Sequence, residues 1–106
     1  SGNNSDGIEI TGSANFNNIY DNHIGVKLGG SGNLGNNAFG VNINYSSDNR
    51  VMNGNIIAYN SAPGVYVSVG TGNLISENSI FSTMPKANGG MAYPTKTKIL
   101  QIMSNG

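Results

Sequence analysis

The sequence predicts an all-β fold, a parallel β-helix solenoid of about three coils. A repeated motif of the form N-x-[IV]-x-x-[NG]-x-I carries this prediction, and it occurs at residues 17–24, 49–56 and 73–80. Before each copy stands a G-[IV]-x-[IV] segment, at residues 7–10, 40–43 and 64–67. The last two units begin 24 residues apart, and a fixed period in the twenties is typical of a solenoid.

Apolar and polar residues alternate within both halves of the unit, which is the periodicity of β-strands. Stacking the units places twelve β-branched aliphatic residues in four inward-facing columns. These columns are Ile8–Val41–Val65, Ile10–Ile43–Val67, Ile19–Val51–Ile75 and Ile24–Ile56–Ile80. Because such side chains pack well on a pleated interior, the columns predict the core.

Asparagine at the start of each motif forms a further column, made of Asn17, Asn49 and Asn73. Asparagine tolerates left-handed backbone at turns, and stacked identical amides can hydrogen-bond as a ladder. The first two motifs are 32 residues apart rather than 24. The excess predicts a Gly/Asn-rich insertion at about residues 25–39, within which we expect residues 29–37 to leave the coil and play no part in the core.

The repeat ends near residue 82, so we expect coils over residues 1–82 and a non-repeat tail over residues 83–106. Proline and glycine indicate loops in the tail. Its apolar segment at residues 98–103 predicts either a short amphipathic turn or a last strand. Because the ends of a solenoid expose unpaired strand edges, we expect the tail to cap one end. We also expect a homo-oligomer formed through the solenoid ends.

Charge and composition exclude several classes of partner. Only 9% of the residues are charged, and the five acids all precede residue 83. No basic stripe runs along the coils, which argues against a nucleic acid partner. No apolar run reaches the roughly 18 residues of a membrane span. Cysteine is absent, so disulfides and Cys-based zinc sites are impossible, and nothing in the sequence indicates a metal site or a cofactor.

Three segments, GNNSDGIEITGS, NNIYDNHIG and GNLISENSIFS, carry a resemblance. Residues 7–82 resemble the Asn/Gly-rich repeats of right-handed parallel β-helix proteins, the pectate-lyase-like architecture. They are also similar to repeat segments of large exported bacterial surface proteins. The resemblance implies a right-handed coil and an extracellular or cell-surface location. It implies no single function, because such repeats occur in polysaccharide lyases, hydrolases, epimerases, adhesins and plain spacers.

The first functional hypothesis is a non-catalytic module, a spacer or a carbohydrate-binding surface of an exported bacterial protein. Sparse ionisable groups and dense repeats favour it. Glu9, Asn42 and Tyr66 fall in one outward-facing column. Since an aromatic ring and polar side chains suit a sugar, we expect these three residues to contact a polysaccharide.

The alternative is a small polysaccharide-active enzyme, a glycoside hydrolase or a lyase. Asp21 and Glu77 share a column two coils apart, so their backbones are expected roughly 9.6 Å apart at about 4.8 Å per coil. Inverting glycosidases hold their carboxyl groups about 6.5–9.5 Å apart. His23, which the alignment places in a column with Asn55 and Ser79, is a candidate general base.

Overall fold

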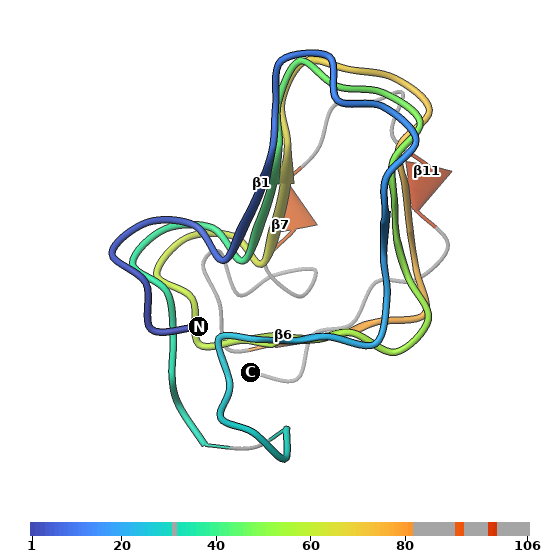
Figure 1. Ribbon diagram of the computed structural model, residues 1–106. Coiled ribbons are helices and arrows are strands. Elements are labelled where there is room, and N and C mark those ends of the chain that lie inside the picture. The colour runs from blue at the N-terminus through green and yellow to red at the C-terminus, as the bar shows by residue number, and fades with distance from the viewer. Residues whose placement is uncertain (31, 82–90, 93–97, 100–106) are drawn as a thin grey trace.

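The computed structural model describes residues 1–30 and 32–81 and, beyond them, the strands at 91–92 and 98–99. These residues form three parallel β-sheets wound into a solenoid of about three coils, and Figure 1 looks along its axis at the three-sided coils. Sheet A contains, in spatial order, β1 (Ile8–Ile10), β4 (Val41–Ile43), β7 (Val65–Val67) and β10 (Met91–Ala92). Sheet B contains β2 (Asn18–Ile19), β5 (Arg50–Met52), β8 (Leu74–Ser76) and β11 (Lys98–Ile99). Sheet C contains β3 (His23–Ile24), β6 (Ile56–Ala58) and β9 (Ser79–Phe81). The predicted all-β solenoid is confirmed.

Three of the four predicted core columns are confirmed by the strand register. Ile8, Val41 and Val65 are successive partners in sheet A, as are Ile10, Ile43 and Val67. In sheet B the column is Ile19, Val51 and Ile75. Side chains of the middle coil are fully buried, whereas Ile10 and Ile19 in the first coil are 7% exposed. The aliphatic interior therefore runs continuously along the solenoid axis.

The fourth predicted column was wrong by one residue. Ile24 pairs with Ile57, not with Ile56, and Ile57 pairs with Ile80. Ile57 is fully buried and belongs to the core, while Ile56 is only partly buried. The cause is Gly54, a left-handed residue with φ of 92° that lengthens this turn of the second coil. Gly54 is an extra residue in this coil, and the N-x-[IV]-x-x-[NG]-x-I motif had aligned it with Asn22 and Asn78.

Asparagine ladders hold all three corners of the coil, whereas the sequence predicted only one such ladder. The expected ladder of Asn17, Asn49 and Asn73 is confirmed, with each amide oxygen accepting both the backbone N–H and the side-chain Nδ2–H of the asparagine one coil earlier. The other two ladders are Asn22–Asn55–Asn78 and Asn3–Asn36–Asn60. The middle member of every ladder is completely buried. Because a buried backbone N–H without a partner is costly, each ladder satisfies the turn that it spans.

The predicted insertion lies mainly at residues 26–34, where the chain projects from the coil (Figure 1). Leu28 at its tip is fully exposed. A Cβ at Gly25 would meet the carbonyl oxygen of Ala58, and one at Gly35 would meet that of Tyr59. The loop thus departs and returns at two glycines that lie against the next coil. The expectation that residues 29–37 have no part in the core was wrong for Asn36, which is fully buried in a ladder.

Deleting residues 26–34 is expected to leave the fold intact. The amide of Leu34 donates to the carbonyl of Gly25 at 3.0 Å, so the two ends of the deletion already adjoin. The shortened first coil would then match the length of the second. Loop closure depends weakly on length, and the loss of the buried Val26 should cost on the order of 1 kcal/mol. Thermal melting of the deletion variant measures this, and an unfolded product would mean that the loop holds the first coil together.

The tail contributes two described strands, since β10 pairs with β7 and β11 pairs with β8. Residues 98–99 therefore form a strand, one of the two predicted alternatives, while residues 100–103 lie outside the described part. A capping role for residues 83–106 stays a prediction that these pairings support. Among the described residues, none belongs to a helix with the length and apolar character needed to cross a bilayer.

Self-association through a solenoid end remains a prediction, and the first coil offers the surface for it. Strands β1, β2 and β3 are the outermost strands of their sheets. A depression of about 390 Å³ lies against this coil, and Ile8, Ile10, Ala14 and Ile19 are among the residues that line it. Sedimentation at micromolar concentration is expected to show an association of 11.0 kDa chains. A monomer at every concentration would contradict it.

Candidate functional site

The outer face of sheet A carries the predicted carbohydrate-binding residues in one row. Glu9 is the strand partner of Asn42, and Asn42 is the partner of Tyr66. Side chains alternate across a strand, so these three point away from the core that their neighbours fill. Glu9 is exposed, and Asn42 and Tyr66 are half-buried. The structure therefore brings the three residues together as one outward row.

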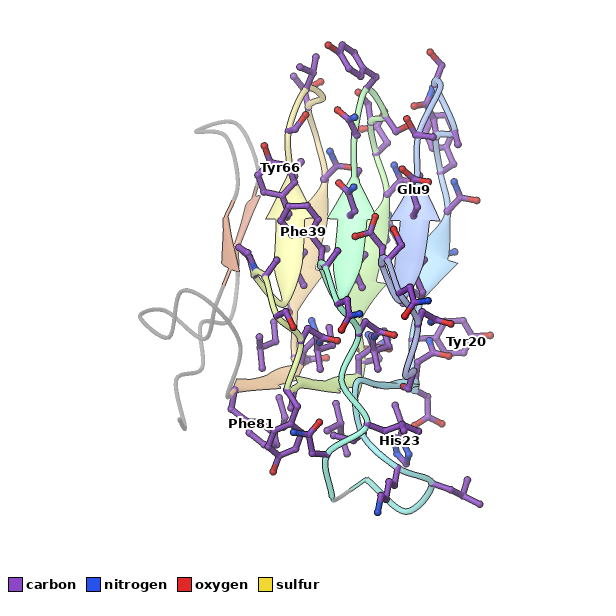
Figure 2. All side chains as sticks on the ribbon, turned by 90° about the vertical axis from the view of Figure 1, so that its left-hand side faces the viewer. Glu9, Tyr20, His23, Phe39, Tyr66 and Phe81 are labelled. Atoms are coloured by element: carbon purple, nitrogen blue, oxygen red, sulfur yellow. The ribbon has the colours of Figure 1, made fainter. Side chains whose placement is uncertain are left out.

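An aromatic pair lies on this row. The rings of Phe39 and Tyr66 stack with their centroids 4.5 Å apart and their planes 10° from parallel, and Figure 2 shows them on the same face as Glu9. Asp6 accepts hydrogen bonds from the Phe39 amide at 3.0 Å and from the Asn42 Nδ2 at 3.1 Å. The side-chain amide oxygen of Asn42, Oδ1, is buried without a partner among the described residues. We name Asp6, Glu9, Phe39, Asn42 and Tyr66 the sheet A platform.

Sequence reasoning missed Asp6 and Phe39, although a signal was present. Each precedes the glycine that opens a G-[IV]-x-[IV] segment, and Pro63 holds the same place in the third unit. Backbone bonds from Gly7 to Phe39 and from Gly40 to Pro63 confirm that these positions stack. Extending the G-[IV]-x-[IV] segment by one residue at its start would have placed Asp6 and Phe39 beside the row of Glu9, Asn42 and Tyr66.

Asp21 and Glu77 occupy the same turn, between sheets B and C, in the first and third coils. Both are exposed and left-handed, with φ of 57° and 58°, and Asn53 with φ of 61° holds this turn in the coil between them. The Asp21 amide donates to the Asn53 carbonyl at 3.2 Å. The column proposed from the sequence therefore exists, and its residue types are those that tolerate left-handed backbone.

His23 lies at the start of β3 and is exposed. The predicted column with Asn55 was wrong, because His23 pairs with Ile56, and Ile56 pairs with Ser79. Asn55 instead belongs to the buried ladder with Asn22 and Asn78, because Gly54 is an extra residue that shifts the second coil by one position. A Cβ at Gly30 would come within 3.5 Å of the His23 ring, so the imidazole stands beside the projecting loop.

Two depressions mark the outer face of sheet B, which the sequence had not indicated as a site. One, of about 310 Å³, is lined by Phe16, Asn18, Asp48, Arg50 and Gly72. The other, also of about 310 Å³, is lined by Asn18, Tyr20, Arg50, Met52 and Asn53. Asn18 and Arg50 are strand partners common to both. Neither depression, nor the one at the first coil, is lined by Asp21, His23 or Glu77.

Comparison with known proteins identifies the family of this chain. A family model described as "Periplasmic copper-binding protein (NosD)" matches residues 1–100 of the 106-residue sequence. Neither a curated protein nor a solved structure matches the chain. The family match covers almost the whole sequence and agrees with the parallel, stacked sheets. This chain belongs to the NosD family and is an exported bacterial β-helix protein.

Proposed function

We propose that the chain is a non-catalytic module of an exported protein and that it binds a carbohydrate chain on the sheet A platform. The observation that carries the proposal is the stacked Phe39–Tyr66 pair beside a row of carboxylate and amide side chains. Aromatic faces pack against the apolar faces of sugar rings, and carboxylates and amides accept and donate to hydroxyl groups. The sheet A platform offers both kinds of contact.

The platform is held in place before any ligand arrives. Asp6 bonds both to the backbone of Phe39 and to the side chain of Asn42, and the ring stack restrains Tyr66. Side chains that are already ordered lose less entropy on binding. A sugar hydroxyl that reached the unpartnered Asn42 oxygen, after a shift of its neighbours, would supply the donor that it lacks.

Tyr66→Ala should weaken glycan binding about tenfold, which corresponds to roughly 1.4 kcal/mol. Affinity electrophoresis against a panel of soluble polysaccharides, followed by calorimetry on those that bind, is the measurement. Tyr45→Ala is the matched control, because Tyr45 is 61% exposed and lies in a turn outside the platform. Equal affinity of the Tyr66→Ala variant and the parent protein would reject the platform, and a panel without any binding would reject the function.

A polysaccharide-active enzyme is the second candidate, favoured by the shared turn of Asp21 and Glu77. Cleavage that disappears in both Asp21→Asn and Glu77→Gln, with melting unchanged, would support it. The turn is exposed and its side chains face solvent, so little excludes water or fixes a substrate there. The module is therefore the function that the geometry supports better.

The family description names copper binding, so the side chains of this chain that could coordinate a metal decide whether a copper site fits it. Protein copper sites use thiolate, thioether and imidazole ligands. The chain has no cysteine and a single histidine, and Met52 is the methionine whose side chain the structure describes. The described residues contain no group of three or more His, Cys, Asp or Glu that could hold a metal ion. These residues do not fit a copper centre, and the proposed function assigns copper no role.

A further inference from the structure

The two ends of the solenoid are open in the same two sheets. We name the first coil, residues 1–24, the front end and the strands β10 and β11 the rear end, and Figure 2 shows them at opposite ends of the solenoid axis. At the front, β1 and β2 are the outermost strands of sheets A and B, and at the rear β10 and β11 are the outermost strands of the same sheets. In sheet C the front edge is occupied, because the Ser1 hydroxyl donates to the His23 carbonyl and accepts from the Gly25 amide. The described residues give sheet C no fourth strand.

The free backbone groups of the front end belong to Glu9 and Asn18. In β2 the Asn17 carbonyl accepts from the Arg50 amide at 2.8 Å. The backbone groups of successive residues in a parallel strand point to opposite neighbours, so the N–H and C=O of Asn18 point away from β5. The same alternation leaves those of Glu9 free in β1, because the Ile8 amide donates to the second coil at 2.9 Å.

The asparagine ladders give the front end a chemical polarity. In every ladder the side-chain oxygen accepts from the asparagine one coil earlier. The first members, Asn3, Asn17 and Asn22, are exposed, and within the described part of the chain no earlier coil donates to their oxygens. The front end therefore presents hydrogen-bond acceptors at its three corners, and a surface that covers it must bring donors.

Charge separates the two ends in the same sense. Residues 1–24 contain Asp6, Glu9 and Asp21 and neither lysine nor arginine, whereas residues 83–106 contain three lysines and no acid. A lysine ammonium has three donor hydrogens and no acceptor. The segment that forms the rear strands thus carries the donors and the positive charge that the front end lacks.

We propose that the rear end of one copy of this chain docks on the front end of a second copy, with β10 and β11 pairing in parallel with β1 and β2. The strand register suits this contact, because Met91 continues the column of Ile8 and Ile99 continues the column of Ile19. The depression of about 390 Å³ at the first coil takes its lining from β1, β2 and the turn between them. Both arriving strands therefore meet an open edge and an apolar column.

The ends that meet in this contact are unlike, and this determines the kind of assembly. An interface between unlike ends that does not close on itself generates an open filament, whereas two front ends would form a closed dimer. Two front ends would also bring like charges and facing acceptors together, which disfavours the dimer. The assembly uses other groups than the stacked rings of the sheet A platform and does not depend on glycan binding.

Sedimentation velocity and light scattering over a range of concentrations are expected to show a mass that keeps rising beyond two chains of 11.0 kDa. Raising the salt from about 0.01 M to about 1 M shortens the screening length from roughly 30 Å to roughly 3 Å and should weaken the association about tenfold. A mass that saturates at two chains, or a monomer at every concentration, would overturn the proposal.

Asn18→Pro tests the edge and the direction of the contact. Proline is tolerated at an edge position whose N–H faces away from the sheet, so the variant should fold while losing the outward donor of β2. Alone, it should stay monomeric at concentrations where the parent protein grows. Its rear end is intact, so a small amount added to the parent protein should terminate filaments and lower their mean mass. In a dimer of two front ends the variant would not join the parent protein, and an unchanged parent mass would therefore reject the unlike-end contact.

Asp21→Lys and Glu77→Lys are the matched charge variants, because the two residues hold the same exposed, left-handed turn in the first and third coils. Asp21 lies at the front end, so its reversal should weaken the association about fivefold, within the range of an exposed ion pair, whereas the reversal of Glu77 should not weaken it. Equal losses in the two variants would overturn the proposal in favour of non-specific charge attraction. This pair decides the question alone if melting shows that Asn18→Pro does not fold.

Discussion

Ile75→Asp is expected to leave the protein unfolded at room temperature. Ile75 is fully buried in the sheet B column behind Val51. Moving a carboxylate into this interior without a partner costs several kcal/mol. A domain of this size is stable by only about 5–15 kcal/mol, and three coils offer little else to absorb the loss. Circular dichroism and thermal melting are the measurements.

Leu74→Asp is the matched control for this substitution. Leu74 is the neighbouring residue of the same strand and is half-buried on the opposite, outward side. The variant should fold and melt within a few degrees of the parent protein. If Ile75→Asp folds equally well, the register of sheet B is wrong.

The same logic separates the two possible registers of sheet C. Ile57 is fully buried, whereas Ile56 is partly buried on the outside of the strand. Ile57→Asp should therefore be as damaging as Ile75→Asp, and Ile56→Asp should be mild. The opposite order would restore the predicted column of Ile24, Ile56 and Ile80. It would also mean that Gly54 is not an extra residue in the turn.

The interior was predictable from the sequence because it depends on a repeated pattern. A one-residue shift of a strand turns every apolar side chain outward, so the alternation determines the register wherever the repeat is intact. Gly54 interrupts that regularity, because a repeat motif of fixed length does not allow for an extra residue in a turn. Aligning Asn22 with Asn55 and Asn78, rather than with Gly54, would have exposed the shift.

The outer surface was less predictable than the interior. Glu9, Asn42 and Tyr66 were placed correctly because outward residues share the register of the core. The Phe39–Tyr66 stack and the two depressions on the outer face of sheet B depend instead on how far side chains reach between coils and on turn conformation. A strained, exposed Phe16 has no signature in the order of residues, because the same turn position holds Asp48 and Gly72.

Asn49→Asp is expected to destabilise the protein by about 3–5 kcal/mol, although it exchanges one side chain for another of nearly the same shape. The Asn49 oxygen accepts from the amide of Asn17 at 2.9 Å and from its side chain at 3.0 Å. Its Nδ2 donates to the Asn73 oxygen and the Ser47 carbonyl, each at 3.2 Å. A carboxylate keeps the acceptor but turns a second oxygen toward those two oxygens. This second oxygen would be fully buried and would have no donor to accept from.

Asn53→Asp makes the same chemical change at an exposed position and should shift stability by no more than about 0.5 kcal/mol. Asn53 is left-handed, and the first coil already places an aspartate, Asp21, at this turn. For a domain of about 100 residues, 1 kcal/mol corresponds to roughly 4–8 °C in melting temperature, so Asn49→Asp should melt more than 10 °C below Asn53→Asp. Because each ladder satisfies a turn that the strands leave unpaired, the gap measures how far amide side chains, rather than aliphatic packing, hold successive coils together. Melting curves that coincide would assign that stability to the aliphatic columns alone.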